Sequence, residues 1–161
     1  MCALLRPHLI YETLDAVPPD ELLRRGVRLV LLDIDNTLAP YTRQTAGDAL
    51  RAWAEAMRGA GLTLYLLSNN KGTRPETFAT ELDLPYVKRA KKPSPEAARS
   101  IMAELNVSPK ETAIVGDQIY TDMLCAHRCG CLAVLIEPIE LHNIWLRLRY
   151  WAERPFRRVH S

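Results

Sequence analysis

An apolar run that ends in two carboxylates is the feature that most limits how this chain folds. Residues 27–37 read VRLVLLDIDNT, so a stretch rich in Val and Leu is followed at once by Asp33, Asp35 and Thr37. Such a run is typical of a strand buried on both faces of a parallel sheet, and ligands of these sheets bind beyond the carboxyl ends of the strands. Two carboxylates this close repel each other, so a cation or a bound proton must stabilise them. Asp and Asn are also ordinary turn residues, and this segment alone does not separate a reactive strand end from a plain turn.

Four further apolar stretches predict strands at residues 62–68, 85–90, 112–117 and 132–138. Helical segments alternate with them, because apolar residues from Ala46 to Met57 repeat at helical spacing and Ser94 before Pro95 is a typical helix start. This alternation predicts right-handed crossovers and helices on both faces of a parallel sheet. We therefore predict an α/β fold, with a Rossmann-like parallel sheet of about five strands, in a single domain spanning residues 1–161.

The composition is that of an ordinary globular protein, with 48% hydrophobic and 25% charged residues. The four cysteines are too few and too clustered for a disulfide framework, which favours a reducing, cytoplasmic location. The spacing of Cys125, Cys129 and Cys131 with His127 matches no common zinc site, so we expect these cysteines to be buried in the hydrophobic core. No apolar run approaches the roughly 20 residues that span a bilayer, and a net charge of +2 does not indicate a nucleic-acid partner.

Polar groups follow the predicted strands and should share one edge of the sheet. Asp33, Asp35 and Thr37 follow the first strand, SNN (residues 68–70) follows the second, and GDQIYTD (residues 116–122) includes the end of the fourth. The sequence KKP (residues 91–93) lies between the last two. Several carboxylates, a hydroxyl and an ammonium together can bind Mg²⁺ and a phosphoryl group.

These four segments resemble the four motifs of the haloacid dehalogenase (HAD) superfamily, in the order that the superfamily shows. DIDNT is similar to the first motif, Ser68 in LLSNN to the second, KKP to the third and GDQIYTD to the fourth. The sequence RPHLIYETLDAV before the first strand, like GDQIYTD itself, resembles the YqeG-like branch of type IIIA of this superfamily. That branch in turn resembles mitochondrial phosphatidylglycerophosphatases. The resemblance covers all four motifs in the right order and implies a phosphatase.

The resemblance also implies a role for each motif residue. Asp33 would be the nucleophile that forms an aspartyl-phosphate, and Asp35 would protonate the leaving oxygen and then deprotonate water. Thr37 would fix the loop, Lys92 would contact Asp33 and the phosphoryl group, and Lys91 is the alternative to Lys92. The implied substrate contacts are Ser68, Asn69 and Lys92. The implied Mg²⁺ site comprises Asp33, the backbone carbonyl near Asp35, Asp117 as a ligand and Asp122 as the residue that orients the site.

The chain leaves no room for the cap domain that many superfamily members carry. Residues 38–61 hold one connector and one helix, and residues 71–92 hold one helix and a short strand. An uncapped crevice suits a phosphate that projects from something large, or a cap borrowed from a partner subunit in an oligomer.

The basic residues gather at the end of the chain. Residues 141–161 contain five arginines and one glutamate, a net charge of +4 against +2 for the whole chain. Leu141, Ile144, Trp145, Leu148 and Ala152 form one helical stripe. Two alternatives stay open: a last helix whose tryptophans are buried against the sheet, or a peripheral contact with an anionic membrane at its inner face.

The leading hypothesis is a capless, Mg²⁺-dependent phosphomonoesterase whose substrate is a phospholipid such as phosphatidylglycerophosphate. The enzymatic alternative is a phosphatase of nucleotides, sugar phosphates or phosphoproteins. The alternative of another class is a binding module that keeps the fold without turnover, docked on a membrane or a ribonucleoprotein.

Overall fold

Strand β2 (Leu29–Leu32) lies inside a six-stranded sheet with the strand order β1-β6-β5-β2-β3-β4. The computed structural model, which describes residues 2–159, shows parallel pairing between all neighbouring strands. The remaining strands are β1 (Leu9–Tyr11), β3 (Thr63–Leu67), β4 (Tyr86–Val87), β5 (Thr112–Gly116) and β6 (Leu132–Ile136). The predicted parallel α/β sheet is confirmed.

The sheet has one strand more than the sequence predicted. Strand β1 pairs with β6 from Leu9 opposite Val134 to Tyr11 opposite Ile136, at the edge of the sheet. Its three residues are only partly buried, so this short edge strand lacks the apolar run that marks an interior strand. Strand β4, at the other edge, is two residues long and therefore shorter than the predicted 85–90.

Helices cover both faces of the sheet. They are α1 (Pro19–Arg24), α2 (Asp48–Gly59), α3 (Arg74–Leu82), α4 (Glu96–Glu104), α5 (Leu124–Cys129) and α6 (Ile144–Glu153). Shorter helical turns occupy Cys2–Leu5, Leu14–Ala16, Pro109–Glu111, Ile119–Met123 and Arg154–Phe156.

Two hydrophobic cores form because successive strand residues point to opposite faces. On one face Val30 shares a core with Met57 of α2 and Phe78 of α3. On the other face Leu31 shares a core with Ile101 of α4. Cys125, Cys129 and Cys131 are free and buried in this second core, as the sequence predicted.

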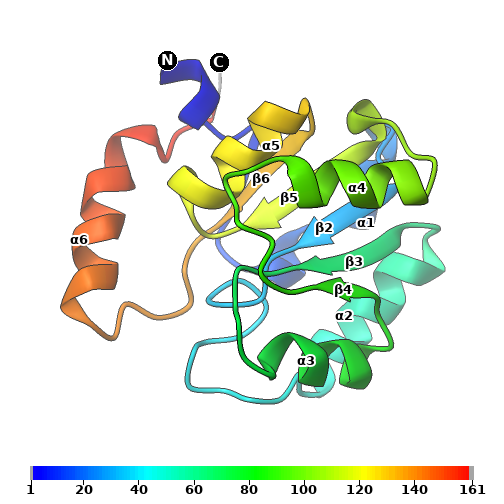
Figure 1. Ribbon diagram of the computed structural model, residues 1–161, viewed down its shortest axis with the longest axis horizontal. Helices are drawn as coiled ribbons and strands as arrows, with labels where there is room; N and C mark the ends of the chain where they lie inside the picture. The colour runs from blue at the N-terminus through cyan, green and yellow to red at the C-terminus, as the bar shows by residue number, and fades with distance from the viewer. Residues whose placement is uncertain (1, 160–161) are drawn as a thin grey trace.

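The carboxyl ends of the strands point toward the side on which α6 lies (Figure 1). Helix α6 stands beside the rest of the domain and is joined to β6 by residues 137–143. Between β2 and α2, and between β3 and α3, the described chain carries loops only, so no cap domain is inserted there. None of the helices in residues 2–159 is long and apolar enough to cross a bilayer.

Candidate active site

Asp33 lies one residue beyond β2 and contacts two other motif residues. Lys92 Nζ donates a hydrogen bond to Asp33 Oδ1 at 2.7 Å and another to Asp122 Oδ1 at 2.6 Å. The Thr37 hydroxyl donates to Asp33 Oδ2 at 3.4 Å. All four side chains are buried, with relative exposures of 6% or less. The structure thus brings together the segments that follow β2, β4 and β5, as expected from the parallel strand order.

Burial and the neighbouring charges shift the pKa values of Asp33 and Lys92. Burial raises the pKa of Asp33 to about 7, because the ionised form loses hydration; Lys92 opposes this rise, and the charges of Asp122 and Asp35 add to it. Burial alone would lower the pKa of Lys92, but the carboxylates of Asp122 and Asp33 outweigh it and raise that pKa above its ordinary value. Lys92 therefore stays an ammonium, whereas Asp33 titrates near neutral pH.

The two lysines of KKP take opposite positions. Lys92 is buried in the cluster, whereas Lys91 is exposed. The Asn69 side chain holds the backbone of Lys92, because Nδ2 donates to Lys92 O at 2.9 Å and Oδ1 accepts from Lys92 N at 2.7 Å. Lys92 is therefore the lysine whose ammonium reaches Asp33, and Asn69 faces its backbone.

Three carboxylates could hold a divalent cation. One oxygen each of Asp33, Asp117 and Asp122 lies within 4.8 Å of the others. Both oxygens of Asp117 are buried without a hydrogen-bond partner among the described residues, and burial followed by the charges of Asp33 and Asp122 raises its pKa well above the ordinary value. A buried carboxylate without a donor is costly unless a cation or proton neutralises it, and hard cations prefer such oxygen ligands. The residues present therefore fit Mg²⁺.

Gly116 makes room for this acidic cluster. A Cβ atom at position 116 would lie 2.3 Å from Asp122 Cγ, far inside van der Waals contact. Without a side chain at Gly116, Asp122 folds back so that its Oδ2 accepts from the Gln118 amide at 3.1 Å. A glycine directly before Asp117 is thus a packing requirement of this site.

Asp35 lies outside the carboxylate cluster. Its Oδ1 is 2.7 Å from Arg74 Nε, and its Oδ2 accepts from Asn70 Nδ2 at 3.1 Å. The Asp35 side chain is therefore held by an ion pair with Arg74 and a hydrogen bond from Asn70, which leaves its backbone carbonyl as the expected metal contact. Sequence reasoning missed Arg74, because an arginine at a helix start carries no signal that it will be buried.

Ser68 follows β3 directly and is fully buried. Its hydroxyl oxygen accepts from the Asn70 amide at 3.1 Å, which shapes the loop that leads to α3. Since β3 is the neighbour of β2 in the sheet, Ser68 lies at the strand end next to that of Asp33.

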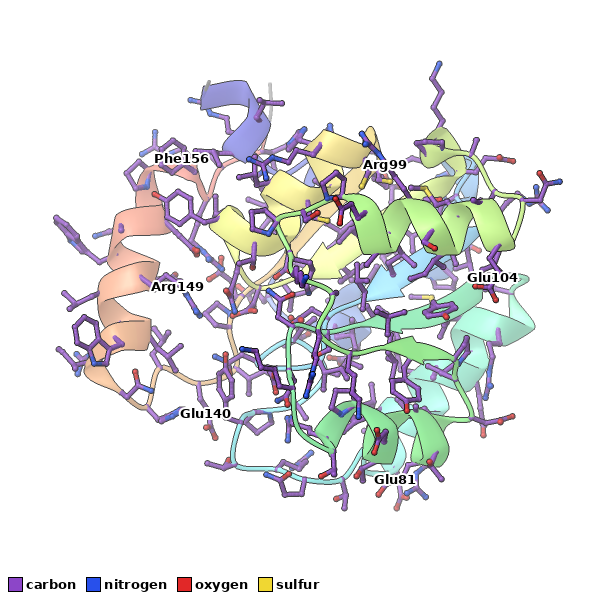
Figure 2. The ribbon with its side chains drawn as sticks, viewed as in Figure 1. Glu81, Arg99, Glu104, Glu140, Arg149 and Phe156 are labelled. Carbon is purple, nitrogen blue, oxygen red and sulfur yellow. The ribbon has the colours of Figure 1, made fainter. Side chains whose placement is uncertain are left out.

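Two arginines of the C-terminal segment reach Asp117, which the sequence did not reveal. Arg149 points from α6 toward the rest of the domain (Figure 2), and its guanidinium lies 3.8 Å from Asp117 Oδ2. Arg157 donates to the Asp117 backbone carbonyl at 3.1 Å. Tyr41 lines a pocket together with Arg149, and burial followed by the Asp117 carboxylate raises the pKa of Tyr41 to about 12. Helix α6 therefore lies beside the carboxylate cluster.

Comparison with known families identifies the chain. A family model described as "Mitochondrial PGP phosphatase" matches residues 2–140. The chain belongs to this family. "Probable phosphatase YqeG" of Bacillus subtilis is 30% identical over 123 residues, which cover 76% of this chain and 72% of that protein. The chain is therefore a HAD-type phosphatase, an enzyme that hydrolyses phosphoric monoesters.

Other relatives of this PGP phosphatase family member are eukaryotic. The mitochondrial phosphatidylglycerophosphatase of Saccharomyces cerevisiae is 27% identical over 149 residues, covering 83% of this chain and 78% of that protein. The chloroplastic and mitochondrial phosphatidylglycerophosphate phosphatase 1 of Arabidopsis thaliana is 28% identical over 145 residues, and the match spans 41% of its length. The family match ends before α6, which begins at Ile144.

Solved structures share the fold. A 3-deoxy-D-manno-octulosonate 8-phosphate phosphatase of Moraxella catarrhalis, solved with magnesium and phosphate ions, superposes with a TM-score of 0.54 at 12% identity, covering 85% of this chain and 94% of that chain. A cobalt-bound phosphatase of the same class from Haemophilus influenzae gives a TM-score of 0.54 at 14% identity, covering 78% of this chain and 75% of that chain. At these identities the likeness concerns the fold alone.

Proposed function

We propose that the chain is a Mg²⁺-dependent phosphomonoesterase that works through a phosphorylated Asp33. The observation that carries this proposal is the contact of the Asp33 carboxylate with the Lys92 ammonium, inside a buried cluster with Asp117 and Asp122. A nucleophilic carboxylate beside a fixed cation is suited to attack a phosphoryl group whose oxygens the cation neutralises.

The reaction divides into two displacements. In the first, an Asp33 oxygen attacks phosphorus, the bond to the leaving oxygen breaks, and Asp35 gives that oxygen a proton. In the second, Asp35 takes a proton from water, the water oxygen attacks phosphorus, and the bond to Asp33 breaks to release phosphate. Lys92 holds Asp33 in place and compensates the negative charge of the phosphoryl oxygens, and Ser68 is assigned to bind one of those oxygens from the adjacent strand end.

The groups that would hold Mg²⁺ are Asp33, Asp117 and the backbone carbonyl near Asp35. Asp122 would orient the cluster through its hydrogen bonds with Lys92 and the Gln118 amide. The metal would supply positive charge that offsets the carboxylates and the phosphoryl group. Arg74 and Asn70 keep the Asp35 side chain clear of this cluster. Asn69, which was expected to bind substrate, is assigned instead to positioning Lys92, because both polar atoms of its amide are bonded to that backbone.

The proposed substrate is a phospholipid monophosphate of the phosphatidylglycerophosphate type. Two relatives carry this substrate in their names, and the family is described by it. The crevice has no inserted cap in the described chain, so a phosphate on a large lipid could enter it from a membrane surface. In this proposal the whole chain, residues 1–161, acts as one catalytic domain, and any oligomer would serve to cover the crevice.

The outer face of α6 supports a peripheral contact with an anionic membrane at its inner, cytoplasmic face. Ile144, Trp145, Leu148 and Trp151 are between 51% and 77% exposed, which disagrees with the alternative that this helix buries its tryptophans. Trp151 lines a hollow of about 410 Å³ together with Arg154 and Arg158, whereas the one acidic residue of α6, Glu153, is buried. The exposed face thus combines apolar side chains with arginines that form no ion pair within residues 2–159, which suits anionic lipid headgroups. The last two residues of the basic segment, 160–161, lie outside the described residues.

The test is phosphate release from a substrate panel. The panel comprises phosphatidylglycerophosphate, glycerol 3-phosphate, a nucleoside monophosphate and a sugar phosphate. Each compound is tested with and without chelator, using the native protein and Asp33→Asn. We expect the lipid to have the highest kcat/KM, and both chelator and Asp33→Asn to abolish turnover. Turnover that persists in chelator would contradict the Mg²⁺ requirement. Preference for a nucleotide or sugar would favour the soluble-substrate alternative, and no hydrolysis of any compound would favour a binding module.

A further inference from the structure

Three cations surround one hollow beside the Lys92 end of the crevice. Lys71, Arg89 and Lys91 line, with Asn69, a pocket of about 570 Å³. All three cationic side chains are exposed, and within residues 2–159 none of them forms a hydrogen bond or an ion pair. Lys91 is the lysine of KKP that the proposed chemistry does not use.

The backbone holds these cations in an unusual arrangement. Arg89 and Lys91 have φ values of 56° and 57°, in the left-handed region that residues other than glycine seldom adopt. The Arg89 amide donates to Asn70 O at 3.2 Å and the Ala90 amide to Ser68 O at 2.9 Å, so the segment before Lys92 runs alongside the loop after β3. This pairing places Arg89 and Lys91 next to the loop that carries Lys71. A non-glycine residue held in this region stores strain, and such strain clusters at functional sites.

Charge balance distinguishes these three residues from their neighbours. Lys88 pairs with Glu76, Arg74 with Asp35, and Lys92 with Asp33 and Asp122. Lys71, Arg89 and Lys91 share one pocket with no carboxylate among its lining residues. Cations gathered in this way repel one another, and an anion bound between them would remove that cost.

We propose that Lys71, Arg89 and Lys91 form a subsite for a second anionic group of the substrate, a diester-linked phosphate that lies next to the phosphate being hydrolysed. Asn69 connects the two sites, because it lines this pocket and also holds the backbone of Lys92. A phosphate diester accepts hydrogen bonds from guanidinium and ammonium groups, and these charge-assisted bonds are roughly twice as strong as neutral ones. The proposal rests on the proposed function, since it names the part of the substrate that the uncapped crevice recognises.

The test compares two soluble ligands that differ by a diester-linked phosphate and the glycerol that it carries. Glycerol 3-phosphate carries the phosphomonoester alone, and deacylated phosphatidylglycerophosphate carries the same ester plus a phosphodiester. Their affinities are measured by calorimetry in the Asp33→Asn background, so that turnover does not intervene. We expect tighter binding of the second ligand, and a loss of this preference by about tenfold for Arg89→Gln and for Lys91→Gln, as for a charge-assisted hydrogen bond. Glutamine keeps an unbranched side chain at both left-handed positions.

Lys110→Gln is the matched control, because Lys110 is exposed in the turn Pro109–Glu111 and is not among the residues that line the pocket. It should leave the preference unchanged. Equal affinity of the two ligands in the Asp33→Asn protein, or equal weakening of both ligands by Arg89→Gln and Lys91→Gln, would overturn the subsite. Kinetics separate the two proposals: hydrolysis of both compounds with equal kcat/KM would contradict the subsite alone, whereas preferential binding without hydrolysis by the native protein would contradict the proposed function alone.

Discussion

Arg74 Nε lies 2.7 Å from Asp35 Oδ1, and the two side chains are only 7% and 14% exposed. The same guanidinium donates to the backbone carbonyls of Ala39, Pro40 and Arg43. Arg74 therefore joins the start of α3 to the loop after β2 and fixes the direction in which Asp35 points. Because proton transfer depends on geometry, the proposed acid depends on a residue that does not itself touch the phosphoryl group.

The first prediction concerns the leaving group. Asp35→Asn should reduce kcat for glycerol 3-phosphate about 100-fold more than kcat for p-nitrophenyl phosphate, because an alkoxide needs a proton to leave and a nitrophenolate does not. Arg74→Lys should shift the ratio of the two kcat values in the same direction, since lysine lacks the guanidinium fork. Steady-state kinetics on both substrates measure this ratio, and Arg51→Lys, on the exposed pair with Glu81, is the control. Equal losses on both substrates for Asp35→Asn would contradict its acid role.

The second prediction concerns pH and Mg²⁺. The pKa of Asp33 is raised from 3.8 to about 7, so without metal its contribution to stability is present below about pH 4 and is lost as pH rises through about 7. Mg²⁺ binds the ionised form, so the rise in Tm caused by Mg²⁺ should be small at pH 5.5 and large at pH 8.5. Thermal unfolding across this range measures the effect. Asp33→Asn should reduce the pH dependence and leave the part that comes from Asp117, whose pKa is also raised. A Mg²⁺ effect that is constant with pH in the native protein would contradict the assignment of Asp33 as a ligand.

The third prediction concerns Arg157, one of the five arginines in the basic segment 141–161. Its side chain cannot face a membrane, because it is 5% exposed, pairs with Glu153 at 3.1 Å and with Glu137 at 3.3 Å, and lies over the Tyr150 ring. Arg157→Ala leaves buried Glu153 without this partner and should lower the free energy of unfolding by about 3 kcal/mol. Exposed Arg158→Ala should change it by less than about 0.5 kcal/mol. Urea unfolding compares the two variants, and similar values would show that the Arg157 contacts contribute little.

The fourth prediction concerns the exposed face of α6. The protein should co-sediment with phosphatidylglycerol vesicles and much less with phosphatidylcholine vesicles, and higher salt should weaken the binding. Replacing Trp145 and Trp151 by Ala should reduce the bound fraction, whereas Leu105→Ala, an exposed leucine just after α4, should not. Failure of the native protein to bind anionic vesicles at low salt would exclude this face as a membrane contact.

The sequence was sufficient to predict the parallel sheet, apart from β1 and the shortness of β4, and the meeting of Asp33, Lys92, Asp117 and Asp122. Apolar runs indicate interior strands, and parallel strands bring their carboxyl ends to one edge of the sheet. The meeting of residues that are far apart in the chain can therefore be predicted without knowing the conformations of the loops. The absence of an inserted cap followed from segment lengths alone.

Other features depend on contacts that no local pattern encodes. Strand β1 exists because an edge strand can pair with β6 while only partly buried, and the partners of Arg74 and Arg149 lie in other segments of the chain. The choice between Lys91 and Lys92 depends on the left-handed backbone of Lys91 and on two hydrogen bonds between the Asn69 side chain and the Lys92 backbone. These contacts depend on tertiary packing, so they cannot be read from the type of a single residue or from its neighbours in the sequence.

One side of helix α6 faces the carboxylate cluster and the opposite side is exposed. The width of the helix therefore sets the distance between the cluster and a bilayer that contacts the exposed side. Arg149 on one side reaches the Asp117 carboxylate, and Trp151 on the other side is 72% exposed. A helix with its side chains is about 10–12 Å across. If the exposed side lay on a bilayer, the crevice would sit about one helix diameter above the lipid surface. A headgroup could then bend up to the carboxylates while its acyl chains stayed in the bilayer, so hydrolysis would require no extraction of the lipid.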